Sequence, residues 1–260
     1  MELTLLDRFL WAATLCGGLL TLLVLIVRGR VRSFPFFTTY IAQGVCTSVA
    51  EYFILCHFPI LTYCYCYWAL GIVDEVFQLF VFYELAKHVF CPTGVWAQDV
   101  RRTFLGLVGA SVVVALLLTV LAHPTGRLPL QTFVLRSDFF SAALMSELLV
   151  GMLVLSATVG LPWKTHVARI AQGLGAYSLL CVATDPITNY LVANRRADLY
   201  KYVNHLEIST YLACEIFWIV MLWREAPVPR ELPESMRIQI YTLQKEVEND
   251  LIRVRAWRRN

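Results

Sequence analysis

Seven long apolar stretches occupy most of this chain of 260 residues, and they constrain its fold more than any other feature. A helix needs about 20 predominantly apolar residues to cross a bilayer. The stretches cover residues 5–27, 35–57, 61–89, 101–122, 130–159, 165–192 and 199–223. Most of the prolines lie at or between their ends, where helices can stop. The sequence therefore predicts an all-α, polytopic membrane protein built as a seven-transmembrane-helix bundle.

The composition agrees with a membrane protein and leaves room for one large domain. Hydrophobic residues make up 58% of the chain and charged residues only 16%, whereas soluble domains carry roughly 25% charged residues. The seven stretches and their loops fill a transmembrane domain over residues 1–225, and residues 226–260 follow as a tail. A net charge of only +3 argues against a nucleic-acid partner.

The basic residues near the helix ends predict an orientation. Cytoplasmic loops carry an excess of lysine and arginine. One side of the predicted bundle collects Arg28, Arg30, Arg32, Lys87, Arg101, Arg102, Lys164, Arg169 and Arg224, and the other has Arg8, Arg127, Arg136, Arg195, Arg196 and Lys201. This bias predicts an N-terminus outside and a C-terminus in the cytoplasm.

Acidic residues inside the apolar stretches are the main functional signal. On residues 35–57, one helix face carries Tyr40, Gln43, Gly44, Thr47, Ser48 and Glu51, and a similar stripe on residues 61–89 carries Tyr67, Gly71, Asp74, Glu75 and Gln78. Carboxylates are costly in hydrocarbon and usually face a polar interior. We therefore predict one ligand-binding site in the outer half of the bundle, formed by Glu51, Tyr67, Asp74, Glu75, Arg136, Asp138, Asp185 and Glu207. Arg136 is the expected countercharge.

Two other interpretations of these residues stay open. Buried acids also tie helices together through hydrogen bonds, each worth on the order of 1 kcal/mol. His57 and His205 with Glu51 and Glu207 are candidates for a metal or proton site, but no HxxxH or HExxH spacing supports a metal. The sequence leaves any cofactor unknown, and GxSxG, P-loop and GxGxxG motifs are absent.

A cysteine cluster and a proline within a helix each allow two local structures. If the loop beside Cys56, Cys64 and Cys66 faces an oxidising compartment, Cys56 could pair with either of the other two. Pro186 lies inside an expected helix and removes a backbone donor, which predicts either a static kink or a hinge beside the polar site.

The tail has the pattern of an amphipathic helix after a stiff, proline-rich break. Its apolar residues follow heptad spacing from Met236 to Trp257, interrupted only by Asp250. A coiled coil would join two copies or bind a cytoplasmic protein through residues 234–257. Equally, the helix could lie on the inner leaflet, with its arginines on anionic lipid.

Residues 67–90, YWALGIVDEVFQLFVFYELAKHVF, look like a recurrent segment of uncharacterised bacterial seven-helix proteins. Together with the expected topology, the chain resembles the seven-helix input modules of bacterial membrane sensors, including those of histidine kinases. The resemblance implies a sensor in the inner (plasma) membrane, although no kinase, cyclase or phosphatase domain is evident. We therefore expect a non-enzymatic sensor or receptor. A small-solute or proton-coupled transporter is the alternative, and an integral-membrane enzyme is the third possibility.

Overall fold

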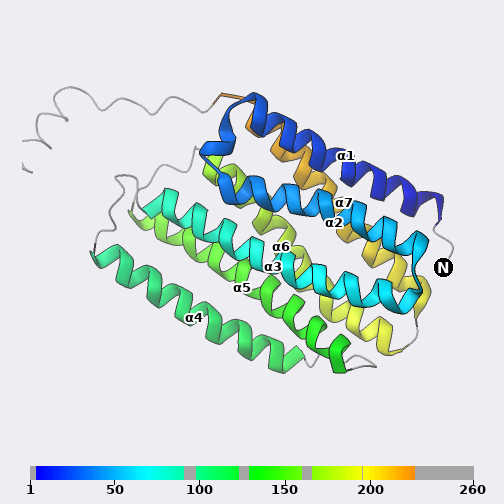
Figure 1. The fold of residues 1–260 in the computed structure, drawn as a ribbon. Coiled ribbons are helices and arrows are strands. Elements are labelled where there is room, and N and C mark those ends of the chain that lie inside the picture. Colours follow the sequence, from blue (N-terminus) through cyan, green and yellow to red (C-terminus); the bar gives the residue numbers. More distant parts are fainter. Residues whose placement is uncertain (1–3, 91–97, 123–128, 160–165, 195, 226–260) are drawn as a thin grey trace, which may run out of the picture. The chain divides into compact units, whose positions relative to one another are not determined.

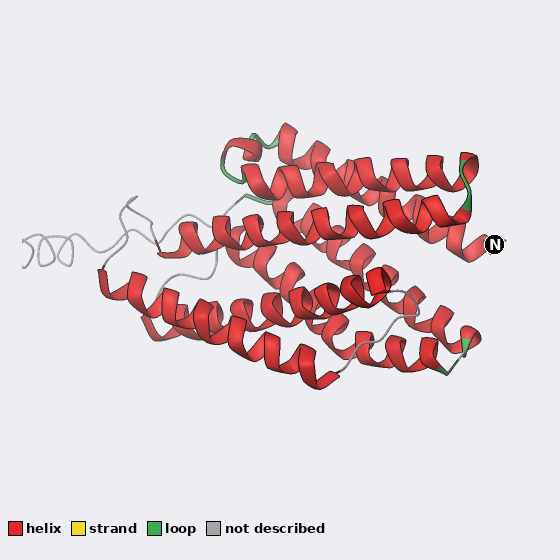
Figure 2. Ribbon diagram, turned by 60° about the horizontal axis from the view of Figure 1, so that its bottom comes forward, coloured by secondary structure: helices red, strands yellow, loops and turns green. Residues whose placement is uncertain are grey.

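Long α-helices form nearly all of the structure, a computed structural model that describes residues 4–90, 98–122, 129–159, 166–194 and 196–225. The helices are α1 (Leu5–Val27), α2 (Pro35–His57), α3 (Ile60–Phe90), α4 (Gln98–Ala122), α5 (Pro129–Val159), α6 (His166–Ala193) and α7 (Ala197–Trp223). A short 3-10 turn, Arg30–Arg32, joins α1 to α2. Figure 2 shows helices joined by short loops at the two ends of the bundle. The predicted all-α fold is confirmed over the described ranges.

Local signals explain where the first two helices begin. Thr4 caps α1, since its side chain accepts from the backbone N–H of Asp7 and the Asp7 carboxylate accepts from the backbone N–H of Thr4. α2 begins at Pro35, and its free N–H groups at Phe36 and Phe37 donate to the carboxylate of Glu84 at 3.1 and 2.9 Å. Glu84 is buried, so this acid caps a neighbouring helix and has a structural role.

Five of the helices are long and apolar enough to cross a membrane, as expected for a multi-pass membrane protein. They are α1, α4, α5, α6 and α7. α2 and α3 fall outside this set, although both were predicted as spans. The reason is compositional, because the polar stripes that contain Glu51, Asp74 and Glu75 lie within these two helices.

The helices pack as a ring with one addition. Each of α1, α2, α3, α5, α6 and α7 packs against the next in that order, and α7 packs back against α1. α4 packs chiefly against α5 from outside the ring and lies at its edge in Figure 1. Consecutive helices run in opposite directions along the bundle (Figure 1). The ring therefore encloses an interior to which six helices contribute.

An apolar core fills the end of the bundle at which α2 and α6 begin. Trp218 of α7 is fully buried, and its ring meets Phe37 of α2 edge-on, with centroids 5.2 Å apart. α6 passes so close that a β-carbon added to Gly173 would overlap the Trp218 indole. Only glycine allows this approach, so Gly173 determines how α6 and α7 pack.

Three further predictions concern local structure. Cys56, Cys64 and Cys66 are free thiols, so neither disulfide alternative is formed. α6 continues through Pro186 from His166 to Ala193. The chain divides into two compact units, Met1–Ala226 and Pro227–Asn260, and the predicted tail helix over residues 234–257 lies outside the described residues.

Candidate functional site

Two adjoining cavities lie inside the ring of helices. The first, of about 320 Å³, lies between α1, α2, α3, α6 and α7. The second, of about 250 Å³, lies mainly between α3, α5 and α6. Tyr67, Asp74, Tyr177 and Glu207 line both, so the two spaces adjoin at these side chains. We call the pair of cavities the chamber.

Seven carboxyl groups line the chamber. The first cavity has Glu51, Asp74, Glu207 and Glu215, and the second adds Glu75, Asp138 and Asp185. Among the described residues, no lysine, arginine or histidine lines either cavity. Like charges repel strongly in a low-dielectric interior, so such a cluster is stable only when protons or bound cations balance its charge.

The acids are close enough to influence one another in a continuous series. Glu51 interacts electrostatically with Asp74, and Asp74 does so with Asp138. Asp185 interacts in the same way with Asp138 and Glu207. The series connects α2, α3, α5, α6 and α7. The acids of these five helices line the two adjoining cavities, and their role in binding a ligand stays a prediction.

Two of the carboxyl groups are close neighbours. Glu75 of α3 and Asp138 of α5 both line the second cavity and interact electrostatically. Beside them, the Gln78 amide donates to Asp74 at 2.9 Å. The second cavity therefore brings together carboxyl groups from two helices.

Glu215 is the most enclosed of the seven acids, with only 2% of its surface exposed. It lies about 12 Å further along α7 than Glu207, by the rise of an α-helix. Gly17 and Gly18 of α1 make room for it, because a β-carbon on Gly17 would overlap the carboxylate. Its Oε2 has no hydrogen-bond partner within the described part of the chain. A buried carboxylate oxygen without a partner is costly.

Tyrosines form much of the wall around the acids. The rings of Tyr177 and Tyr211 meet edge-on with centroids 5.3 Å apart. Both Tyr40 and Tyr211 line the first cavity, which Tyr67 and Tyr177 also line. The first cavity therefore combines aromatic rings with carboxylates.

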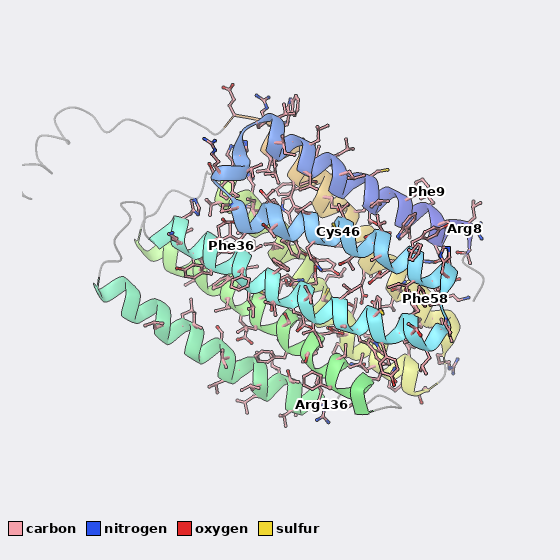
Figure 3. All side chains as sticks on the ribbon, viewed as in Figure 1. Arg8, Phe9, Phe36, Cys46, Phe58 and Arg136 are labelled. Atoms are coloured by element: carbon pink, nitrogen blue, oxygen red, sulfur yellow. The ribbon has the colours of Figure 1, made fainter. Side chains whose placement is uncertain are left out.

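One predicted site residue lies elsewhere. Arg136 is exposed and lines neither cavity, and Figure 3 shows it at the outer edge of the bundle near the start of α5. Its predicted role as the countercharge therefore finds no support in the lining of the two cavities. Arg136 lies only two residues from Asp138, and side chains two apart on a helix do not share a face.

The histidines proposed for a metal site have other partners. His205 of α7 contacts the Asp7 carboxylate of α1 at 2.6 Å. His57 contacts the carbonyl oxygen of Phe53 at 2.9 Å, and its ring stacks on Phe53. No three His, Cys, Asp or Glu side chains of the described residues are grouped closely enough to hold a metal ion.

The predicted set of site residues did not include Glu215, Tyr40, Tyr177 or Tyr211, which line the first cavity. A signal was present in α7, where Glu207, Tyr211 and Glu215 follow one another at four-residue intervals and share one face. Tyr177, Cys181 and Asp185 have the same spacing in α6. The prediction grouped only acids expected in the outer half of the bundle. Glu215 was left out because it lies nearer the other end of α7.

No protein-family model, curated protein or solved structure matches this chain in comparisons with known proteins. The resemblance to the seven-helix modules of bacterial sensors therefore stays a prediction.

Proposed function

We propose that this protein is a non-enzymatic membrane sensor or receptor that binds a positively charged ligand in the chamber. One observation carries the proposal: seven carboxyl groups face two adjoining cavities whose described lining includes no basic side chain. A cation is the ligand that relieves their mutual repulsion. The predicted residues Glu51, Tyr67, Asp74, Glu75, Asp138, Asp185 and Glu207 are its proposed contacts, and Glu215 joins them.

The proposal includes seven membrane spans, with α2 and α3 among them. Both helices have an apolar side turned away from the chamber, where Phe53, Val73, Val76 and Phe80 are exposed. Exposed apolar side chains suit lipid, while the acids face the interior. Mean hydropathy adds the two faces together, so it underestimates helices of this kind. At 23 residues, α2 is about 35 Å long, enough to cross the hydrocarbon core.

We further propose the predicted orientation, with the N-terminus outside the plasma membrane and the C-terminus in the cytoplasm. Arg28, Arg30 and Arg32 then lie on the cytoplasmic side. Residues 234–257 would pass a signal on by pairing with a second copy or a cytoplasmic protein, or would lie on the lipid surface.

The test is thermal unfolding of the full-length protein in lipid nanodiscs with added sodium, magnesium and organic amines, and at several pH values. A ligand that binds only the folded protein raises the melting temperature with its concentration. We expect at least one cation or the proton to do so, and chloride, acetate and uncharged solutes to have no effect. Stabilisation by anions alone, or by none of these solutes and at no pH, would contradict the proposal.

Neutral variants supply the control. Asp74→Asn and Asp138→Asn each remove one chamber charge, so each should raise the melting temperature without ligand and reduce the shift caused by the cation. Glu147→Gln is the matched change outside both cavities, and it should leave the cation's effect unchanged.

A proton-coupled carrier is the second candidate, and the neighbouring carboxyl groups of Glu75 and Asp138 in the second cavity favour it. Proteoliposomes that enclose a pH-sensitive dye distinguish the two. A carrier should move protons across the bilayer when the cation is added on one side, and Glu75→Gln should abolish the movement. A sensor should bind the cation without flux.

A further inference from the structure

We infer that the first cavity binds a small organic ammonium ion, with Glu215 holding the charge and the tyrosines enclosing its substituents. The inference rests on the proposed function and names the class of ligand. It also gives Glu215 the deepest position in the site.

Glu215 supplies an observation independent of the acidic cluster. Its side chain is almost completely buried, lines the first cavity, and has an Oε2 with no partner in the described structure. A carboxylate held in this way has lost its water and gained no donor in exchange. The unpartnered Oε2 packs against Gly17 of α1, and an ammonium group that enters the cavity would balance the charge of the carboxylate from the cavity side.

The shape of the wall favours an organic cation over a metal ion. Carboxylates that coordinate a metal must converge on one point, and no group of three possible ligands among the described residues does so. Aromatic rings, in contrast, attract alkylammonium groups through their faces. Tyr40, Tyr177 and Tyr211 bring three rings to the cavity that Glu215 lines.

The size of the cavity fits a ligand of a few heavy atoms. Its volume is about 320 Å³, near the lower end of the range of roughly 300–1,000 Å³ for small-molecule pockets. A second space of about 110 Å³, lined by Asp7, Arg8 and Trp11, shares Glu51 with the first cavity. Glu51 therefore stands between the first cavity and the end of the bundle at which α1 begins.

The test measures binding of choline and of ethanolamine to the full-length protein in nanodiscs by isothermal titration calorimetry. The comparison ligand is 3,3-dimethyl-1-butanol, which has the shape of choline without its charge. We expect at least one of the two amines to bind, and we expect no binding of the uncharged alcohol. The inference is overturned if both amines bind more weakly than about 10 mM, or if the alcohol binds as well as choline.

Two variants locate the bound cation. Glu215→Gln keeps the shape of the side chain, removes its charge and should weaken amine binding about tenfold or more. Glu147→Gln should leave the affinity as it is. Equal losses in both variants, or none in Glu215→Gln, would show that Glu215 does not hold the ligand.

The ring of Tyr211 gives a further comparison. Tyr211→Phe keeps the aromatic face and should retain most of the affinity, while Tyr211→Leu should lose about fivefold. The same affinity in both variants would remove the aromatic part of the inference. If sodium, magnesium or protons stabilise the protein and neither amine binds, this inference fails and the proposed function stands.

Discussion

At two positions of the bundle, glycine is required because a large side chain of a neighbouring helix packs directly against the backbone. Gly17 of α1 makes room for the carboxylate of Glu215, and Gly173 of α6 makes room for the indole of Trp218. Both of these large side chains belong to α7. Residues without a β-carbon therefore decide how closely α7 approaches its two neighbours in the ring.

Gly173→Ala should destabilise the protein by about 1–3 kcal/mol, the usual cost of overpacking a core. The fully buried Trp218 ring has no space into which it could withdraw. Gly109→Ala is the control, because a β-carbon there meets no atom within 4 Å and alanine favours a helix. Unfolding in detergent–lipid micelles measures both variants. Equal stability of the two would show that the close packing of α6 on α7 contributes nothing.

Individual residues also show how far the sequence could predict the site. Acids within apolar stretches have few stable environments, and for this reason seven of the eight predicted site residues line the chamber. Arg136 is the eighth, and it is exposed and lines neither cavity. Glu84 could not have been recognised as a helix cap, since its partners at Phe36 and Phe37 depend on how α2 packs against α3.

At the scale of helices, α2 and α3 combine an acidic face and an apolar face in an unusual arrangement. Their polar side chains line the chamber, and their exposed residues are largely apolar. A soluble helical bundle has the opposite pattern. This inversion is the reason why helices of low overall hydropathy are proposed here as membrane spans.

Val76→Arg tests whether the outer face of α3 contacts lipid. Val76 is 46% exposed, and a charged side chain in the hydrocarbon core costs at least about 2.5–3.5 kcal/mol. We expect a sharp loss of folded protein in membranes, measured as the fraction that stays monodisperse after extraction. Val76→Leu should behave like the unchanged protein. If the arginine variant folds equally well, the outer face of α3 lies in water.

Helix positions were easier to predict than helix neighbours. The predicted bounds of α1 and α2 match the structure, because Pro35 and the polar segment before it give clear stop and start signals. The place of α4 outside the ring had no such signal. Residues 105–122 of α4 are strongly apolar, which suits a helix that packs chiefly against α5 from outside the ring, but many apolar helices lie inside bundles.

The whole molecule follows one principle, in which the ring of helices separates an acidic interior from an apolar exterior. The cavities, the neighbouring carboxyl groups of Glu75 and Asp138, and the enclosed Glu215 all lie on the inner side of the ring. We propose that a ligand enters from the end of the bundle at which α1 begins. The central claim is that this interior attracts cations and admits them from outside the cell.

Charge-selective labelling of a cysteine in the chamber tests that claim most directly. The eight native cysteines are replaced, and a single cysteine is placed at Ser48, which lines the first cavity, or at its neighbour Val49, which is exposed on the outer surface of α2. Intact cells are then treated with membrane-impermeant methanethiosulfonates, one carrying trimethylammonium and the other sulfonate. We predict that Ser48→Cys reacts much faster with the cationic reagent than with the anionic one, while Val49→Cys reacts with neither. Equal rates with both reagents at Ser48→Cys, or no reaction there, would contradict an acidic chamber open to the outside.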